Sequence, residues 1–280
     1  MSKKNKKKSW VRVLVLLVCI PIFCVSAYMV FSQLYVDYRQ NQTFGSLIAQ
    51  VNQARANPDM PDAGADVAAA QGDGEAAADP GAPESEPSML TYYAPLYAQN
   101  SDFFGWIEIE NTEVNYPVMH TPEDPEFYLH RAFDGSDAYS GVPFLDANCV
   151  PNCGNYIVYG HNMKNGTQFA TIPHYKEKEF WESHPAVRFD TLYETGVYAV
   201  VAAFYSQAYP ADAVGVFRYY QYTDLRDEDR FNEYMEQVKA ASLYETGVEA
   251  EYGDQLLTLS TCEYHKTDGR FVIVAKKRNT

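Results

Sequence analysis

An uncharged stretch near the N-terminus limits what the chain can fold into more than any other feature. Val13 to Phe31 contain no charged side chain, and uncharged residues continue to Val36. This length matches the roughly 20 residues that a helix needs to cross a bilayer. A cleaved signal peptide fits less well, because the apolar stretch is longer than an ordinary signal sequence and no A-x-A-like cleavage site follows it. We therefore expect residues 13–36 to form an uncleaved transmembrane anchor.

The charges that flank this stretch predict its orientation. Residues 1–12 contain six basic side chains and no acidic one. Basic residues stay on the cytoplasmic side of a membrane helix. We expect a single-pass membrane protein. Residues 1–12 form its cytoplasmic tail, and the chain after Val36 lies outside the cell.

The rest of the chain is strongly acidic. The total formal charge is −15, and without the six N-terminal basic groups the remainder carries about −21. Such a domain is soluble and repels phosphate backbones. The sequence therefore argues against nucleic acid as a partner and indicates a well-solvated exported surface.

Two segments separate the anchor from the folded part. Residues 37–57 have mixed charge and helical spacing, so they are expected to continue as a juxtamembrane segment. Residues 58–89 hold eight acidic residues and no basic one, with much Ala, Gly and Pro. Because such a composition buries too little apolar area to offset chain entropy, we predict a disordered acidic linker there.

Residues 90–280 are predicted to form one mostly β domain, either a barrel or a sandwich. Short apolar runs broken by turn residues occur at 105–109, 155–160, 197–205, 255–261 and 271–277. The segment 227–243 is the exception, because Phe231, Tyr234, Met235 and Val238 follow the spacing of an amphipathic helix. A second, weaker helix is expected near 92–103.

Three of the five cysteines lie outside the apolar stretch. Cys149 and Cys153 flank Pro151 in a loop-like segment, and the sequence leaves open whether they pair. A zinc site built from these two cysteines and His161 is less consistent with the sequence, since no second ligand pair follows at a familiar spacing.

Cys262 ends the apolar run LLTLSTC, and His161 directly follows the run NYIVYG. A thiol attacks a peptide carbonyl as the thiolate, so a catalytic cysteine needs a base or a positive neighbour. If the two runs are neighbouring parallel strands, both side chains meet at one rim of the sheet. His265 competes with His161 for the role of base, but it lies in a polar loop.

Arg270 opens the strand that follows Cys262 after seven residues, so a hairpin brings the two together. A guanidinium stays charged and stabilises an oxyanion. Taken singly, each residue has a plainer interpretation: a packed thiol, a turn histidine and a solvated edge arginine. The combination of the three favours catalysis.

The string TLSTC at 258–262, followed by Arg270 and preceded by YGHNM at 159–163, resembles the sortases, membrane-anchored cysteine transpeptidases of Gram-positive bacteria. The long helix before the cysteine strand favours class B, and the resemblance covers about residues 90–280. It implies an eight-stranded β-barrel with added helices, a sortase catalytic domain at 90–280, and chemistry that needs no metal or other cofactor.

The resemblance also implies roles and partners. Cys262 would attack the Thr carbonyl of a C-terminal sorting signal, His161 would protonate the leaving amine and Arg270 would stabilise the oxyanion. Amines on a peptidoglycan cross-bridge or stem peptide would then resolve the thioacyl enzyme. The positions that match the family's sorting-signal groove are Leu129, Ser260, Glu263, Tyr234 and Met235.

Pro125 departs from the family, which often has Asn at this position, so an NPxT-type signal is expected with its exact form open. A pilin polymerase that uses a lysine acceptor remains an alternative. A non-catalytic membrane-tethered binding module is a weaker one, because Cys, His and Arg are all present. A papain-like protease is disfavoured, since there the cysteine precedes the histidine.

Overall fold

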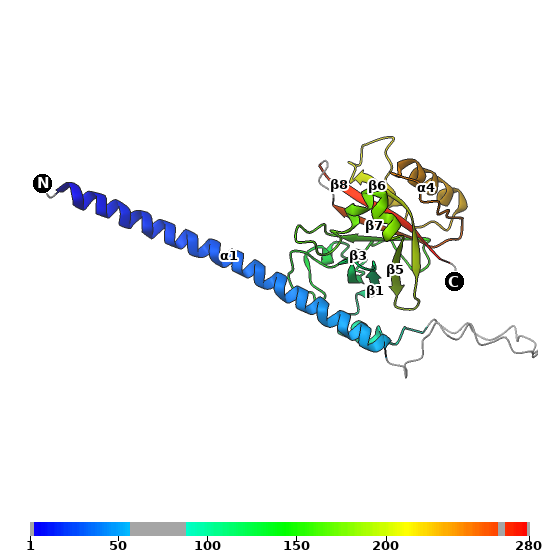
Figure 1. Cartoon of the computed structure of the whole chain (residues 1–280), viewed down its shortest axis with the longest axis horizontal. Coiled ribbons are helices and arrows are strands. Elements are labelled where there is room, and N and C mark those ends of the chain that lie inside the picture. Colours follow the sequence, from blue (N-terminus) through cyan, green and yellow to red (C-terminus); the bar gives the residue numbers. More distant parts are fainter. Residues whose placement is uncertain (1–2, 57–87, 263–266, 279–280) are drawn as a thin grey trace, which may run out of the picture. The chain divides into compact units, whose positions relative to one another are not determined.

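The computed structural model describes residues 3–56, 88–262 and 267–278 (Figure 1). The chain divides into two compact units, Met1–Phe44 and Gly45–Thr280. The predicted linker at 58–89 falls outside the described residues except for its last two positions.

The first unit consists of most of helix α1, Lys3–Arg55, which has Pro21 in its interior. Among the described residues, one helix is long and apolar enough to cross a membrane, and it contains the predicted anchor. A continuous helix is the form expected there, because it satisfies its own backbone hydrogen bonds in lipid. The orientation in a membrane stays a prediction.

The second unit is built on eight strands that close into a barrel in the order β1-β2-β3-β4-β7-β8-β6-β5. The strands are β1 Phe103–Glu108, β2 Asn115–Met119, β3 Phe144–Leu145, β4 Asn155–Gly160, β5 Ala186–Thr191, β6 Val197–Gln207, β7 Leu256–Cys262 and β8 Gly269–Lys277. The helices around them are α2 Ala94–Gln99, η1 Phe127–His130, η2 Ile172–Lys176, α3 Lys178–Ser183, η3 Tyr219–Gln221 and α4 Glu228–Ala241. The expected eight-stranded fold is confirmed.

Strands β4, β7 and β8 form the part of the barrel that positions the candidate site. β4 pairs with β7 in parallel over its whole length, and β7 pairs with β8 as an antiparallel hairpin. Their apolar runs are continuous because these strands are buried on both faces. The parallel pair and the hairpin are the two conditions under which the sequence brings Cys262, His161 and Arg270 together, and both are met.

Helix α4 packs on the outside of the barrel beside β6 (Figure 1). It begins after Asp227, whose side chain accepts a hydrogen bond from the Arg230 amide at 2.9 Å. This N-cap satisfies one of the amide groups that a helix start leaves unpaired. The helix matches the predicted 227–243 segment.

The weaker helix expected near 92–103 is much shorter. Only Ala94–Gln99 is helical, because the chain leaves helical geometry at Asn100 and enters β1 at Phe103. Pro95 in the first turn fits there, since that position needs no amide donor.

The last turns of α1 belong to the second unit. Leu47 and Val51 are each only 1% exposed. The Arg55 guanidinium donates to Asp190 Oδ2 at 2.7 Å and to the Tyr93 hydroxyl at 2.8 Å, and the Asp190 side chain is 0% exposed. Residues 45–55 are therefore part of the compact unit, in addition to the predicted 90–280 domain.

Candidate active site

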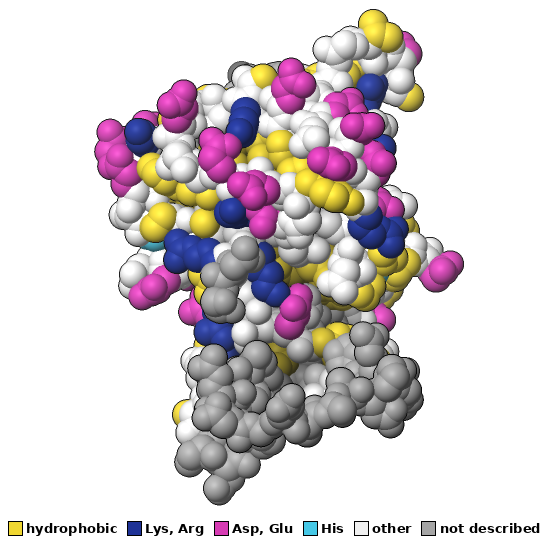
Figure 2. Space-filling model, turned by 90° about the vertical axis from the view of Figure 1, so that its right-hand side faces the viewer, with side chains coloured by type: hydrophobic (Ala, Val, Ile, Leu, Met, Phe, Trp, Pro, Cys, Tyr) yellow, Lys and Arg dark blue, Asp and Glu magenta, His cyan; other side chains and the backbone are white. Residues whose placement is uncertain are grey.

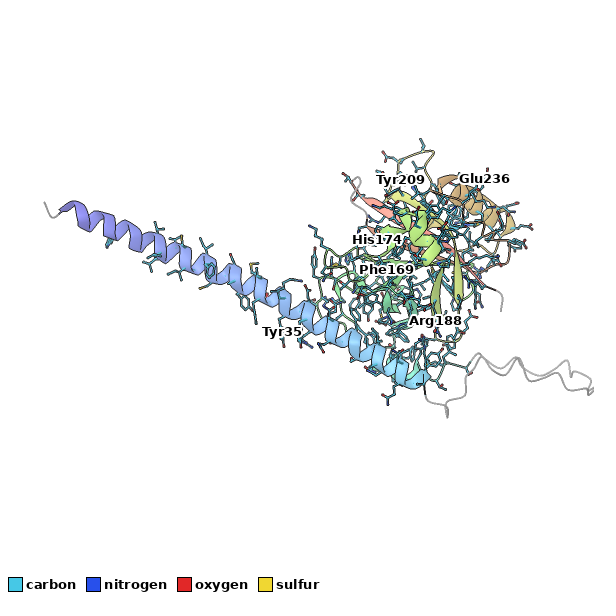
Figure 3. All side chains as sticks on the ribbon, in the orientation of Figure 1. Tyr35, Phe169, His174, Arg188, Tyr209 and Glu236 are labelled. Atoms are coloured by element: carbon cyan, nitrogen blue, oxygen red, sulfur yellow. The ribbon has the colours of Figure 1, made fainter. Side chains whose placement is uncertain are left out.

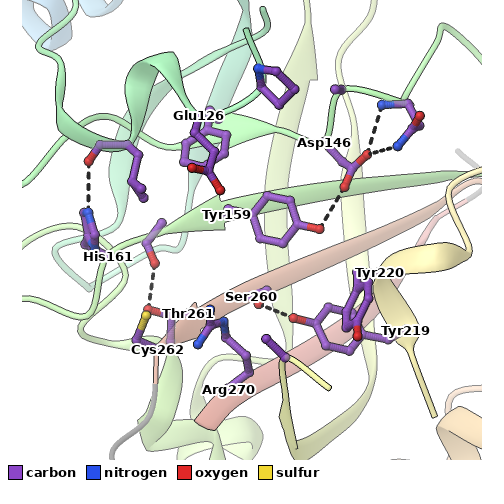
Figure 4. Close-up of a pocket in the computed structure, with 17 residues that line it drawn as sticks. Glu126, Asp146, Tyr159, His161, Tyr219, Tyr220, Ser260, Thr261, Cys262 and Arg270 are labelled. Carbon is purple, nitrogen blue, oxygen red and sulfur yellow. Dashed lines mark hydrogen bonds between the residues drawn. The ribbon is translucent and has the colours of Figure 1, made fainter. Parts of the chain in front are cut away.

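The strands β4, β7 and β8 bring three side chains to one rim of the barrel. Gly160 pairs with Thr261, so His161 follows β4 directly beside Cys262 at the end of β7. Cys262 pairs with Arg270 across the hairpin. Directly opposed residues of an antiparallel pair project from the same face. All three side chains line one cavity of about 410 Å³ (Figure 4).

The imidazole of His161 is held from two sides. Its Nε2 lies 2.9 Å from the Leu129 carbonyl oxygen. Its ring stacks on His130, with centroids 5.3 Å apart, and His130 in turn stacks on Tyr139 at 6.0 Å. Burial lowers the pKa of His161, and the charges of His130 and Arg270 lower it further, although the Leu129 carbonyl acts in the opposite direction. The site therefore favours the neutral imidazole.

The glycine before His161 is required by packing. A Cβ on Gly160 would lie 2.6 Å from the ring of Phe169, which is fully buried inside the domain (Figure 3). The Phe169 amide also donates to the His161 carbonyl at 2.9 Å. Phe169 thus supports the backbone that carries the imidazole.

The backbone of Cys262 is tied to the strand that carries His161. The Asn162 side-chain amide donates to the Cys262 carbonyl at 3.0 Å. The Thr261 hydroxyl donates to the Gly160 carbonyl at 2.7 Å. Cys262 itself is partly exposed and is a free thiol. These bonds fix the backbone of Cys262 beside the chain that carries His161, without depending on a flexible loop.

The Arg270 guanidinium is oriented by its own strand. Its Nη1 donates to the Gly269 carbonyl at 3.0 Å and to the Asp268 carbonyl at 3.3 Å. Asp268 has φ +55°, a left-handed conformation that Asp tolerates better than most residues. In Figure 4 the guanidinium lies close to Cys262. A fixed, charged donor at this position suits stabilisation of a developing negative charge.

Some of the residues predicted to contact the sorting signal line the cavity, and others do not. Leu129 and Ser260 line the cavity. Tyr234 and Met235 do not: both are buried in the core under α4, and the Tyr234 hydroxyl is 2.9 Å from the Thr258 hydroxyl. Their helical spacing reflects packing against the barrel, which corrects their expected place in the groove.

Glu263, the fifth predicted contact residue, and His265 lie outside the described residues. The Pro125 position noted in the sequence lies in the cavity lining.

Sequence reasoning missed the residues of η3 and the loop before β4. Tyr219 and Tyr220 line the cavity, and the Tyr219 hydroxyl is 2.7 Å from the Ser260 hydroxyl (Figure 4). Asp146 also lines it and accepts a hydrogen bond from Tyr159 at 2.8 Å. The aromatic run RYYQY at 218–222 was the available signal, but it has no periodicity that indicates which way the rings point.

A zinc site that joins Cys149, Cys153 and His161 is inconsistent with the fold. The two cysteines precede β4 and His161 follows it, so about 20 Å of extended strand separates them. Among the described residues no group of three His, Cys, Asp or Glu side chains has an arrangement that could hold a metal ion.

A closed β-barrel with a thiol, an imidazole and a guanidinium at one rim defines a class of cysteine-dependent acyl-transfer enzymes. Comparison with known proteins identifies the class. A Sortase domain model matches residues 107–278. Sortase B of Listeria monocytogenes is 33% identical over 188 residues, which cover 65% of this chain and 72% of that protein.

Solved structures agree with this match. The crystal structure of sortase B from B. anthracis in complex with AAEK1 superimposes with a TM-score of 0.59 at 28% identity, covering 71% of this chain and 90% of that one. The Staphylococcus aureus sortase B–substrate complex gives a TM-score of 0.59 at 26% identity, covering 69% and 87%. The chain belongs to the sortase family of cysteine transpeptidases, and within it to class B.

Proposed function

We propose that this class B sortase cleaves an NPxT-type sorting signal near the C-terminus of secreted proteins and joins the new Thr carboxyl group to a peptidoglycan amine. One observation carries the proposal. Cys262, His161 and Arg270 come from three different strand ends and line the same cavity.

Acylation is the first half of the reaction. The Cys262 thiol passes its proton to His161, and the sulfur attacks the Thr carbonyl carbon. Arg270 donates to the resulting oxyanion. The C–N bond of the signal then breaks, and His161 returns the proton to the leaving amine. The product is a thioester between Cys262 and Thr.

Deacylation uses an incoming amine in place of water. The amine attacks the thioester carbonyl, gives a proton to the His161–Cys262 pair and releases the thiol, so that one amide bond replaces another. A cross-bridge or stem-peptide amine of peptidoglycan is the proposed acceptor.

The sorting-signal peptide of the substrate is proposed to bind along the cavity between η1 and η3. Leu129 of η1 lines one side, and Tyr219, Tyr220 and Ser260 line the other, where the Tyr219 hydroxyl is 2.7 Å from the Ser260 hydroxyl. The ring of Tyr220, which is partly exposed, offers apolar area to the peptide. The similarity to the S. aureus sortase B–substrate complex supports a peptide in this position.

The location is also a proposal. The apolar part of α1 would cross the cell membrane with the basic residues 1–12 in the cytoplasm, and the barrel would face the cell wall. This arrangement places the cavity where exported proteins and peptidoglycan meet.

The test uses the full chain in detergent with an NPxT peptide and a panel of amines. We expect an acyl-enzyme on Cys262 by mass spectrometry and a ligated product with a peptidoglycan-type amine. Cys262→Ala should form neither, with an unchanged melting temperature. Turnover retained by Cys262→Ala contradicts the proposed mechanism. Ligation only to a pilin-like lysine peptide contradicts the proposed acceptor.

A further inference from the structure

Two thiols that the proposed reaction does not use lie together in the loop between β3 and β4. Cys149 and Cys153 are both 0% exposed. Their sulfur atoms lie 3.5 Å and 3.3 Å from the same acceptor, the Asn155 carbonyl oxygen. Each thiol also shifts the pKa of the other, in opposite directions.

The backbone between the two cysteines is folded into tight turns. The Cys149 amide donates to the Asp146 carbonyl at 3.0 Å, and the Cys153 amide donates to the Val150 carbonyl at 3.1 Å, so each cysteine ends a tight turn. Between them Asn152 has φ +59°. The intervening chain is thus folded back on itself, and the sulfurs are brought together by local geometry.

Contacts on both sides keep the sulfurs in place. The Ile157 amide donates to Cys149 Sγ at 3.4 Å. The Cys153 carbonyl accepts from the Leu225 amide at 2.8 Å. Gly154, at φ +90°, approaches Leu225 so closely that a Cβ would lie 2.9 Å from it. These contacts hold the Cys149 sulfur and the Cys153 backbone in place.

We propose that Cys149 and Cys153 are a redox modification site that forms an intrachain disulfide in the exported protein, an inference that rests on the extracellular location proposed above. Oxidation removes one hydrogen from each thiol and forms one S–S bond. The two electrons and two protons pass to a low-molecular-weight or protein disulfide, which becomes two thiols. Disulfides persist outside the cell, where no reducing pool removes them.

The chemistry of the pair supports thiol–disulfide exchange. A hydrogen bond from the Cys149 thiol lowers the pKa of Cys153, whereas the pKa of Cys149 is raised. One thiolate stabilised by its neighbour is the reactive form in exchange, and the neighbour then resolves the mixed disulfide.

The bond would brace one wall of the active-site cavity. Asp146, Ala147 and Asn148 line the cavity and directly precede Cys149. Closing the loop reduces the freedom of the unfolded chain, so the oxidised protein is expected to be more stable. Cys262 lies at the end of β7 next to His161, beyond the opposite end of β4, and stays a free thiol.

The experiment equilibrates the full chain in detergent with equal concentrations of reduced and oxidised glutathione. The sample is then acid-quenched, unfolded, alkylated with N-ethylmaleimide and digested with trypsin. Arg131 and Lys164 are consecutive trypsin sites, so one peptide, 132–164, carries both cysteines. We expect this peptide to be unalkylated and lighter by two hydrogen atoms. A doubly alkylated peptide, or one that carries glutathione, overturns the proposal.

Matched variants separate this result from the fate of Cys262. Cys149→Ser should leave Cys153 alkylated in the same peptide. Cys262→Ala should leave the Cys149–Cys153 pair oxidised, as in the chain without substitutions. The oxidised protein should melt at a higher temperature than the reduced one, and the Cys149→Ser/Cys153→Ser double variant should not respond to glutathione. Equal melting temperatures of the two forms would refute the bracing of the loop. Because no readout depends on turnover, failure of the proposed function would not be mistaken for failure of this inference.

Discussion

The surroundings of the His161 imidazole determine its protonation state, on which the proposed chemistry depends. It meets a backbone carbonyl on one nitrogen, a second imidazole on its face and a guanidinium nearby. Burial is the largest of these effects, and it lowers the pKa of His161. A neutral imidazole accepts the thiol proton, which is the role that acylation requires.

Removing His130 is expected to raise the pKa of His161. His130→Ala removes a positive neighbour and exposes the ring face, and both changes favour the imidazolium. NMR titration of His161 measures the shift without requiring turnover. Tyr139→Ala is the control, because Tyr139 stacks on the far face of His130 and should change the pKa less. An unchanged pKa in His130→Ala contradicts the electrostatic role of the stack.

The lowered pKa of His161 also links stability to pH. Because the unfolded chain binds the proton more tightly, this group's contribution to stability is present above about pH 6.5 and is lost as the pH falls towards the lower folded pKa. In His130→Ala the folded pKa rises, so this acid-induced loss should become smaller.

Arg270→Lys tests the geometry of the guanidinium rather than its charge. Lysine keeps the positive charge but lacks the planar set of donors. We expect the rate of acyl-enzyme formation to fall by about 10² to 10³, with the melting temperature unchanged. Single-turnover kinetics with an NPxT peptide give the rate. Near-normal acylation by the lysine variant would remove Arg270 from oxyanion stabilisation.

At the scale of elements, the end of α1 acts as a structural part of the barrel. Arg55→Ala removes one charged donor from the buried Asp190 carboxylate. Arg188, which lies 3.2 Å from it, remains as a donor. We expect a loss of about 1–3 kcal/mol in the free energy of unfolding, measured by urea denaturation. Arg226→Ala, which breaks an exposed ion pair with Asp224, is the control and should cost clearly less than Arg55→Ala. Equal effects of the two variants would show that the α1 contact adds nothing.

The helices η3 and α4 both present tyrosines, but to different surroundings. Tyr220 lines the cavity, whereas Tyr234 is 0% exposed in the core. Tyr220→Ala should raise KM for the sorting peptide with little change in melting temperature. Tyr234→Phe, which loses the bond to Thr258, should lower the melting temperature and leave KM unchanged. The opposite pattern would restore Tyr234 to the groove.

At the scale of the whole molecule, residues that flank the acidic segment contact each other. Arg55 and Tyr93 are hydrogen-bonded, although residues 57–87 lie between them in the chain. Acidic side chains are also spread over the face drawn in Figure 2, interspersed with Lys and Arg.

Replacing residues 57–87 by a short Gly/Ser linker should preserve the fold. The segment has 31 residues, and about eight residues would shorten the loop fourfold. If the segment is the flexible linker that the sequence predicts, the closure entropy falls by about 1.2 kcal/mol. Thermal melts should show equal or slightly higher stability, and turnover of a soluble peptide should be unchanged. A large loss of stability would show that the segment itself packs on the domain.

The sequence by itself determined the features that depend on local order. Continuous apolar runs predicted β4, β7 and β8, and helical spacing predicted α4. The catalytic candidates Cys262, His161 and Arg270 were identified from their combination beside strand ends and from the resemblance of TLSTC and YGHNM to the sortases.

Only the tertiary structure decided which aromatic residues face the cavity and where the end of α1 packs on the domain. Periodicity shows that Tyr234 and Met235 are buried on one face, but it does not say whether that face meets the core or a ligand. The two-residue strand β3 and the contact between Arg55 and Asp190 have no local signal either. They arise from pairings between residues far apart in the chain, and such contacts are specified by the packed shape of the barrel rather than by neighbouring sequence.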